Sequence, residues 1–456
     1  MSFSLVEINN IIGFENWKNQ INKKLIFKNI SIDSRNVLPQ DLFLAIKGNN
    51  FDGHNFIDDA IKKGVKALII NKENENLVPD NIPYWVVSDT KEAFQRLALY
   101  KRKKLNIPVV AITGSVGKTT TKEITGEIMK SIGKVKISAK NNNNEIGVAT
   151  TILESTVEDK ILILEMGMRG LGQIENLSKF SEPDIAVITN IGTSHIGLLG
   201  SKDKIAEAKC EIVKYLKPNG LVIIPSNDKL LIKTLKNIWK GRILKINIIK
   251  LEEKENYNNH TKDLILGLYD DKKNSIVVDD KLFQISFKGI HNAYNFLFAY
   301  AISQQFSIKF KTFNFFNFKS ICGRNRIIKR NKVTVLDETY NASPESVKAC
   351  IDVLLEYPGN HFLILGSMKE LGVMSTKYHL EILDLINEVD IKYCVFLCDL
   401  DEEKILKEKF SSRKIIFKNN KSEVAKLIND RTSKDDFVLI KGSRYWELEE
   451  VISFIH

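Results

Sequence analysis

The chain of 456 residues is 43% hydrophobic, which suffices for about three domains with well-filled cores, and its apolar runs are far too short to span a bilayer. The start, MSFSLVEINN, lacks the basic flank and apolar centre of a signal peptide, so we expect a cytoplasmic protein without membrane insertion. The net charge of +11 comes from lysines scattered among acidic residues, which argues against a nucleic-acid partner and fits small anionic substrates.

Three α/β domains are predicted in chain order. Residues 1–100 alternate short apolar strands (ISIDS, LFLAI, ALII, YWVV) with helical stretches such as NFIDDAIKKG. The charge run YKRKKLNIP indicates a linker into residues 101–320, where VVAIT, KILILEM and DIAVITNI are typical of a parallel sheet covered on both faces. Residues 250–287 suggest an antiparallel extension before the helix NAYNFLFAYAISQQF. Residues 321–456 alternate strands and helices again, as a Rossmann-like open α/β sheet does.

The segment AITGSVGKTTTKEI combines an apolar strand, a glycine turn and a helix start. Gly114 and Gly117 allow a tight turn whose N–H groups point at an anion. Lys118 brings a positive charge to the terminal phosphates, and Thr119 offers a hydroxyl to Mg²⁺. The motif is a shortened phosphate-binding loop, because Ile112 stands where the general pattern has its first glycine. The plainer alternative is a glycine-rich surface turn before a polar helix.

Two later strands end in residues that suit a metal and phosphate site. Glu165 ends the strand ILILE, and in such folds an acidic residue at the end of a neighbouring strand faces bound Mg²⁺. His195 follows the strand VITNI in a glycine-rich loop, which favours a metal or substrate ligand. A helix after it carries Lys209. A surface glutamate, a structural histidine and a solvated lysine are the alternatives.

Asparagines gather in two stretches. Asn143 and Asn144 lie in NNNNEIGV, a loop opening a helix, where they either line a site or serve as turn residues. Asn292 and Asn295 lie on one helix face in GIHNAYN, where their amides can read a base edge or cap the helix.

The third domain supplies positive charge. Arg324 and Arg326 lie in CGRNR, and Lys441 and Arg444 flank Gly-Ser at a strand end, a shape suited to phosphate or carboxylate. An arginine from a separate domain can close over a nucleotide. The five cysteines have no metal-ligand spacing, so we expect neither a disulfide nor a zinc site.

In this order and spacing, the motifs resemble the Mur ligase family over essentially the whole chain. The resemblance rests on ISIDSR, DLFLAIKG, FDGHNFIDDAIKKG, TGSVGKTTTKE, NNNNEIGV, LEMGMRGLGQI, ITNIGTSHIGLLGS, EAKCEI, GIHNAYN, GRNR, DETYNASPESV, LGSMKELG and KGSR. Within the family, DETYNASP and LGSMKELG are typical of the ligases that add D-alanyl-D-alanine to UDP-N-acetylmuramoyl-tripeptide. The resemblance implies a monomeric, ATP-dependent amide ligase of peptidoglycan precursor synthesis that forms an acyl phosphate.

The resemblance also implies residue roles. Thr119 and Glu165 would hold one Mg²⁺, and a second would be held by Glu165, His195 and a carbamylated Lys209. ATP would be bound by Gly114, Ser115, Gly117, Lys118, Thr119, Thr120, Asn292, Asn295, Arg324 and Glu338, with the asparagines at adenine. The first domain would bind the UDP-sugar through Asp33, Ser34, Arg35, Lys47, Gly48, Phe51, Asp52, Gly53 and His54. The peptide and phosphate side would be lined by Asn143, Asn144, Tyr340, Asn341, Lys441 and Arg444. The catalytic set would be Lys118, Glu165, His195, Lys209 and Arg324.

Three alternatives stay open at this point. A sibling Mur ligase adding a single amino acid usually carries DNPR in its last domain, which is absent here, and a folylpolyglutamate synthetase lacks the UDP-binding first domain that SIDSR suggests. A nucleic-acid-dependent P-loop ATPase belongs to another class, and the dispersed charge argues against it. Three positions depart from the usual family pattern: Glu338, Ser343 and Ser367.

Overall fold

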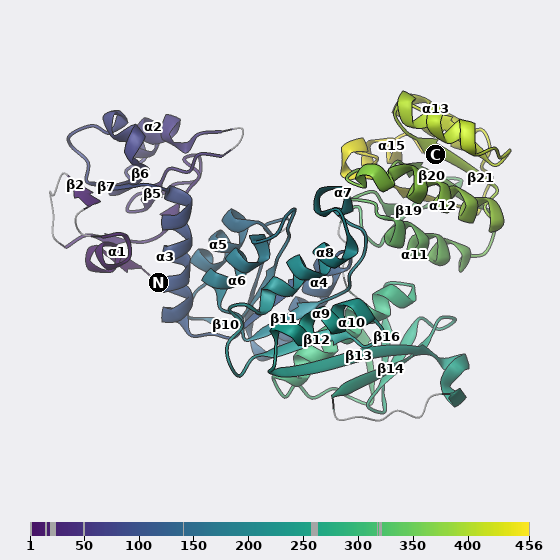
Figure 1. Ribbon diagram of the computed structural model, residues 1–456, viewed down its shortest axis with the longest axis horizontal. Coiled ribbons are helices and arrows are strands. Elements are labelled where there is room, and N and C mark those ends of the chain that lie inside the picture. The colour runs from purple at the N-terminus through teal and green to yellow at the C-terminus, as the bar shows by residue number, and fades with distance from the viewer. Residues whose placement is uncertain are drawn as a thin grey trace.

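The computed structural model describes residues 2–13, 16–18, 24–48, 51–139, 141–256, 263–316, 318 and 322–455. The chain forms three α/β lobes that follow one another in sequence, purple, teal and yellow-green in Figure 1. The predicted three-domain α/β architecture is confirmed, whereas the domain boundaries at 100 and 320 stay predictions. Within the described residues, no helix has both the length and the apolar character needed to cross a membrane.

The N-terminal lobe is built on a five-stranded sheet in the order β2-β7-β6-β5-β4, with β2 antiparallel to β7 and the other pairs parallel. Side chains of β5 alternate between two apolar clusters on opposite faces, as a doubly covered strand requires. The elements are β1 (Phe3–Ser4), α1 (Leu5–Ile12), β2 (Trp17–Lys18), β3 (Ile26–Phe27), β4 (Ile30–Ser31), β5 (Leu42–Leu44), α2 (Ile57–Lys62), β6 (Ala67–Asn71) and β7 (Tyr84–Val87).

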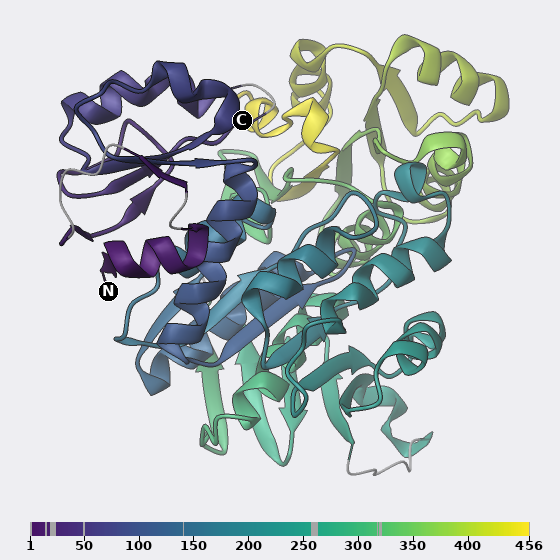
Figure 2. The ribbon, with the colours of Figure 1, turned by 60° about the vertical axis from the view of Figure 1, so that its left-hand side comes forward.

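Helix α3 (Thr90–Leu105) runs from the N-terminal lobe into the middle lobe, as Figure 2 shows. The predicted linker is therefore wrong over most of its length, because its charged residues belong to this helix. Lys101 donates a hydrogen bond to the Leu153 carbonyl, and the Arg102 guanidinium lies 2.8 Å from an Asp184 carboxylate oxygen. Both cations are buried, so a charge run that suggested solvent instead fixes α3 to the middle lobe.

The middle lobe contains a ten-stranded sheet in the order β17-β16-β15-β14-β13-β12-β11-β8-β10-β9. The seven neighbouring strands from β14 to β9 in this order, β8 included, are parallel. Strand β15 is antiparallel to β14 and β16, which confirms the predicted antiparallel extension. The strands are β8 (Val109–Thr113), β9 (Lys134–Ile137), β10 (Asp159–Glu165), β11 (Ile185–Ile188), β12 (Leu221–Pro225), β13 (Arg242–Lys250), β14 (Leu264–Asp270), β15 (Ser275–Val278), β16 (Lys281–Ile285) and β17 (Phe313–Phe316).

Helices cover both faces of this sheet. Val109 and Ala111 of β8 pack into the cluster that includes α5, α6, α8 and α9, while Val110 and Ile112 pack against α4 and α10. This alternation explains why the strands read as continuous apolar runs. The helices are α4 (Lys118–Met129), α5 (Glu145–Glu154), α6 (Gln173–Ser181), α7 (Ile196–Leu199), α8 (Lys202–Cys210), α9 (Lys229–Ile238) and α10 (Ile290–Gln304).

The C-terminal lobe is a six-stranded sheet in the order β18-β19-β23-β20-β21-β22, parallel except for β18. Its five predicted strands are confirmed. The elements are β18 (Arg326–Lys329), β19 (Val333–Glu338), α11 (Pro344–Leu355), β20 (His361–Gly366), α12 (Ser375–Glu388), β21 (Tyr393–Leu397), α13 (Leu400–Lys409), β22 (Ile415–Lys418), α14 (Lys421–Asn429), β23 (Asp436–Lys441) and α15 (Glu449–Ile452). All five cysteines of the chain are free.

A buried histidine makes this lobe sensitive to acid. His379 Nε2 accepts the Met368 N–H at 2.8 Å, and burial lowers the pKa of His379 to about 4. Because the folded pKa lies below the unfolded value of about 6.5, the unfolded chain binds more protons in between. The contribution of His379 to the free energy of unfolding is therefore fully present above about pH 6.5 and is lost as the pH falls toward 4.

We expect His379→Gln, whose amide oxygen can accept the same N–H, to flatten this dependence. Between pH 7 and pH 5 the wild type should lose about 2 kcal/mol more free energy of unfolding than the variant does. Urea unfolding at the two pH values measures the difference. Equal losses in both proteins would contradict the assignment.

Candidate functional site

The glycine turn lies where the strand order of the middle sheet reverses. Strand β8 has β10 on one side and β11 on the other, all parallel, so their carboxyl ends meet at one edge. Ligands in open α/β sheets bind at this position. The loop after β8 leads into α4, whose N-terminal N–H groups face the same edge.

Two glycines of the loop have no space for a side chain. A Cβ on Gly114, at φ +150°, would lie 1.8 Å from the Thr189 hydroxyl oxygen, and one on Gly117, at φ +84°, would lie 2.5 Å from Asn295 Oδ1. Asn190 holds the loop from outside, accepting the Val116 N–H at 3.1 Å. These close contacts explain why both positions are glycine, and they confirm a tight turn rather than an open surface loop.

The side chains of Lys118 and Lys209 line the same buried region. Lys118 Nζ donates to the carbonyls of Gly114 at 2.8 Å and Ser115 at 3.2 Å. Burial lowers the pKa of Lys118 to about 8, although Glu165 opposes the shift. Burial, with Lys118 nearby, lowers the pKa of Lys209 well below its ordinary value. In the described part of the chain, no hydrogen bond or ion pair holds the Lys209 amine.

Glu165 ends β10 beside the loop and is 2% exposed. Its Oε1 accepts the Asn143 amide at 3.0 Å, while its buried Oε2 has no hydrogen-bond partner and lies 3.7 Å from Lys122 Nζ. An unsatisfied buried carboxylate oxygen is costly. The oxygen fits a hard cation such as Mg²⁺, which prefers oxygen ligands.

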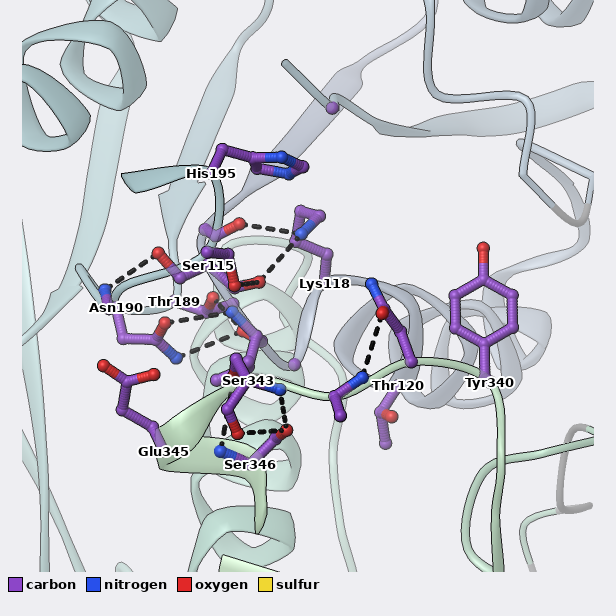
Figure 3. Close-up of a pocket in the computed structure, with 18 of the residues that line it drawn as sticks. Ser115, Lys118, Thr120, Thr189, Asn190, His195, Tyr340, Ser343, Glu345 and Ser346 are labelled. Atoms are coloured by element: carbon purple, nitrogen blue, oxygen red, sulfur yellow. Dashed lines mark hydrogen bonds between the residues drawn. The ribbon is translucent and has the colours of Figure 1, made fainter. Parts of the chain in front are cut away.

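His195 directly precedes α7 and lines the same region (Figure 3). Its Nδ1 lies 2.5 Å from a carboxylate oxygen of Glu370, which comes from the C-terminal lobe. Burial lowers the pKa of His195, and the Glu370 charge opposes this. A neutral imidazole is the form that binds a metal.

The predicted asparagines form hydrogen bonds with other groups of the protein. Asn292 and Asn295 of α10 are buried, and the Asn295 amide donates to Asn292 Oδ1 at 3.2 Å, while its own oxygen accepts the Thr121 hydroxyl at 3.1 Å. The Asn292 amide donates to Asn325 Oδ1 at 2.7 Å, a contact with the C-terminal lobe. Asn144 caps α5 by accepting the Gly147 N–H, as the turn-residue alternative predicted.

The C-terminal lobe adds cations from several elements. The Arg324 guanidinium lies 4.0 Å from the centre of the Tyr340 ring, a cation–π contact, and the Tyr340 hydroxyl donates to Asn141 of the middle lobe at 2.7 Å. Buried Lys441 donates to the Asn341 carbonyl at 2.9 Å. Burial raises the pKa of Glu338, which Lys441 opposes. Arg444 forms an ion pair with Glu449.

The middle and C-terminal lobes line a cavity of about 1520 Å³ between them. Figure 3 shows Lys118 and His195 on one side, with Ser343, Glu345 and Ser346 approaching from the other lobe. The sequence-predicted residues that line it are Gly114, Ser115, Gly117, Lys118, Thr120, Asn143, Asn144, Glu165, His195, Lys209, Asn292, Asn295, Arg324, Glu338, Tyr340, Asn341, Lys441 and Arg444. Thr119 is buried at the start of α4, outside this lining.

The residues predicted to bind the UDP-sugar lie in the N-terminal lobe, apart from this cavity. Asp33 and Arg35 form an ion pair at 2.9 Å in the turn after β4. In the turn after the neighbouring parallel strand β5, the Gly48 N–H donates a hydrogen bond to the Phe51 carbonyl. Both turns therefore lie at one edge of the sheet. His54 is buried, and its two ring nitrogens already contact Asp52 and the Asn71 N–H.

Sequence reasoning missed residues that join the two lobes. Glu345 accepts hydrogen bonds from the Thr193 N–H and hydroxyl, both at 2.9 Å, and Glu370 faces His195. Both lie in quoted motifs, PESV and KELG, but nothing in the motifs indicates a partner in another lobe. The positive φ of +65° at Glu370, unusual for glutamate, is visible only in the structure.

The fold and the site define a nucleotide-binding enzyme that uses a phosphate-binding loop and that closes its cleft with a second α/β lobe. Three family descriptions match the chain in order: Mur ligase family, catalytic domain, at 26–111; Mur ligase middle domain at 112–303; and Mur ligase, glutamate ligase domain, at 323–444. The chain belongs to the Mur ligase family.

Among similar proteins, the UDP-N-acetylmuramoyl-tripeptide–D-alanyl-D-alanine ligase of Synechocystis sp. is 36% identical over 362 residues, which cover 79% of this chain and 76% of the relative. The crystal structure of MurF from Acinetobacter baumannii has a TM-score of 0.86 at 26% identity, covering 99% of this chain and 98% of that one. MurF ligase from Thermotoga maritima in complex with ADP has a TM-score of 0.80 at 28% identity, covering 93% and 96%.

The contact between Gly117 and Asn295 generates a prediction. In Gly117→Ala the new Cβ meets Asn295, so the loop shifts, and we expect the dissociation constant for ADP to rise about tenfold or more. Gly200→Ala is the matched control, because Gly200 has φ +83° with nothing within 4 Å of the added Cβ. Calorimetric titration with ADP should show the control within about twofold of wild type. Similar affinities for the two variants would contradict the role of the loop.

Proposed function

We propose that this chain joins D-alanyl-D-alanine to UDP-N-acetylmuramoyl-tripeptide with hydrolysis of ATP to ADP and phosphate. The observation that carries the proposal is a cavity in which the phosphate-binding loop, a buried acidic residue and cations of a second lobe meet. The named relatives carry this activity in their names over most of the chain length. The cytoplasm supplies ATP, and we propose that the enzyme acts there as a monomer.

The reaction needs positioned charge rather than a nucleophilic side chain. The terminal carboxylate of the tripeptide attacks the γ-phosphorus, the bond to ADP breaks, and an acyl phosphate forms. The amine of D-alanyl-D-alanine then attacks the acyl carbon, phosphate leaves, and the amine loses a proton as the amide forms. Lys118 and Arg324, which line the same cavity, stabilise the negative charge on the phosphoryl oxygens.

We propose that residues of the middle lobe hold two divalent cations. Bound Mg²⁺ would neutralise the phosphate oxygens and orient the transferred group. Glu165, whose buried Oε2 accepts no hydrogen bond within the described structure, would hold one ion with Thr119, which is buried at the start of α4, and the second with His195 and Lys209. Lys209 can serve only if its positive charge is removed.

We infer that Lys209 carries a carbamate. Burial lowers the pKa of Lys209, which favours the neutral amine, and a neutral amine attacks CO₂ at carbon, loses one proton and becomes an anionic carbamate. The product has oxygen donors that suit Mg²⁺. The absence of a hydrogen-bond partner for the amine within the described residues agrees with a group that is completed by modification.

The N-terminal lobe is the proposed site for the UDP-sugar. The turns after β4 and β5 lie at one sheet edge and offer Arg35, Lys47 and N–H groups to a diphosphate. His54 is held inside the lobe by Asp52 and the Asn71 N–H, so we expect it to support the turn rather than touch the ligand. The single-amino-acid ligases, the folylpolyglutamate synthetases and the nucleic-acid-dependent ATPases are less supported, since the named relatives at this coverage add a dipeptide.

The first test measures phosphate release from ATP with UDP-N-acetylmuramoyl-tripeptide, with and without D-alanyl-D-alanine. We expect release to depend on the dipeptide and to fall about a hundredfold or more in Lys118→Ala, because a phosphate contact is lost. Lys130→Ala, an exposed lysine at the end of the same helix, is the control. Release that ignores the dipeptide, or that responds instead to DNA or RNA, would sink the proposal.

The second test concerns the carbamate. Lys209→Ala should abolish turnover while the protein stays folded, and acetate should partly restore turnover by supplying a carboxylate in the vacated space. In ¹³C-bicarbonate the wild type should show a carbamate resonance that the variant lacks. Lys204→Ala, an exposed lysine on the same helix, should keep both the activity and the resonance. An active Lys209→Ala protein would refute the carbamate.

A further inference from the structure

The turn at Glu370 in the C-terminal lobe docks directly onto the turn at His195 in the middle lobe. The Gly197 N–H donates to the Glu370 carbonyl at 2.9 Å. A Cβ on Gly372 would lie 2.7 Å from Gly197 Cα, so the two turns touch backbone to backbone. A side chain on either glycine would push the lobes apart. Glycine at these two positions therefore allows the backbones of the two turns to touch.

Both turns hold a non-glycine residue in the left-handed backbone region, with φ +66° at His195 and +65° at Glu370. Such conformations are costly for residues other than glycine and persist where the surroundings impose them, often at functional sites. Here they direct the two side chains at each other, and His195 Nδ1 lies 2.5 Å from Glu370 Oε2. The contact lacks the alignment of a full hydrogen bond, which is common before ligands bind.

The pair leaves the other ring nitrogen of His195 for a ligand. A carboxylate at Nδ1 favours the tautomer with its proton on Nδ1, so that Nε2 presents its electron pair. Among the described residues no hydrogen bond engages Nε2. His195 lines the cavity together with Lys209 and Glu165, the other proposed metal ligands.

We propose that Glu370 is a positioning residue that orients His195 for its metal, so that this metal site is complete only when the C-terminal lobe is docked. The inference rests on the proposed function, which brings the metal to His195. Docking of the C-terminal lobe should therefore raise the affinity of this site for its metal. Because coupling between two binding events is reciprocal, metal binding must favour docking by the same factor. Metal binding at His195 in the middle lobe thus depends on closure of the cleft by the C-terminal lobe.

Glu345 provides a matched control on the same interface. It is also an acidic residue of the C-terminal lobe, and its carboxylate accepts two hydrogen bonds from Thr193 and lies 4.0 Å from Lys202. Glu345 therefore holds the lobes together through Thr193, which lies two residues before His195 in the chain, and not through the imidazole. A general loss of docking should appear in both variants, whereas misorientation of His195 should appear only without Glu370.

The first experiment titrates the full chain with Mn²⁺ in the presence of ADP and follows free Mn²⁺ by electron paramagnetic resonance, with Mn²⁺ as the stand-in for Mg²⁺. His195→Ala identifies the binding step that needs the imidazole. We expect Glu370→Gln to weaken that step about tenfold, as removal of a carboxylate behind a histidine ligand does, and Glu345→Gln to stay within about twofold. Unchanged affinity in Glu370→Gln, or an equal loss in both variants, would overturn the inference.

The second experiment measures docking itself. Spin labels at Lys236→Cys and Lys404→Cys, both exposed, in a Cys322→Ser background report the distance between the lobes. With ADP present, Mn²⁺ should raise the ratio of docked to undocked protein in the wild type about tenfold more than in Glu370→Gln. A ratio that ignores Mn²⁺ in the wild type would overturn the coupling.

Neither readout contains the tripeptide or the dipeptide, so the two proposals fail separately. Normal Mn²⁺ coupling without dipeptide-dependent phosphate release would remove the proposed function alone. In the active enzyme, excess Mg²⁺ should restore the turnover of Glu370→Gln but leave His195→Ala inactive, since only the former keeps its ligand. Failure of excess Mg²⁺ to restore Glu370→Gln would also overturn the positioning role.

Discussion

Two lysine side chains, Lys118 and Lys209, lie in one buried cavity, and the rest of the site depends on this constraint. Burial lowers the pKa of Lys118 and of Lys209, and the charge of Lys118 makes the charged form of Lys209 less favourable still. Lys118 is held by loop carbonyls, so it keeps a place for a phosphate beside it. Lys209 has no such hydrogen bonds in the described structure, and a neutral or modified amine relieves the repulsion. Lys118 therefore stays in the cavity as the cation for a phosphate, while Lys209 is suited to a different role.

The chemistry needs two lobes because neither supplies a complete set of charges. The middle lobe brings the loop, Glu165 and His195 to the carboxyl edge of its sheet, where parallel strands collect ligands. The C-terminal lobe brings Arg324 and Lys441 to the opposite wall. Walls from two lobes would limit the access of water to an acyl phosphate between them, which water would otherwise hydrolyse. Contacts across the cleft are thus part of the site and not only of the fold.

Much of this could be predicted from sequence, because the strands are short apolar runs and the glycine loop follows one of them. The ends of β8, β10 and β11 meet by topology, which is why Glu165 and His195 could be placed near the loop. The tail of α3 was mistaken for a linker, because its cations are satisfied by backbone carbonyls distant in sequence. The contacts of Glu370 could not be predicted, since they depend on how two lobes pack and on a left-handed backbone at a glutamate.

The central claim is that the tripeptide carboxylate is phosphorylated before the amide bond forms. This claim is tested most directly with tripeptide whose terminal carboxylate carries ¹⁸O, incubated with the enzyme, ATP and D-alanyl-D-alanine. Transfer through an acyl phosphate moves one carboxylate oxygen into inorganic phosphate, so mass spectrometry should find one ¹⁸O atom in phosphate for each amide formed. Unlabelled phosphate, or ¹⁸O recovered in AMP, would contradict the account.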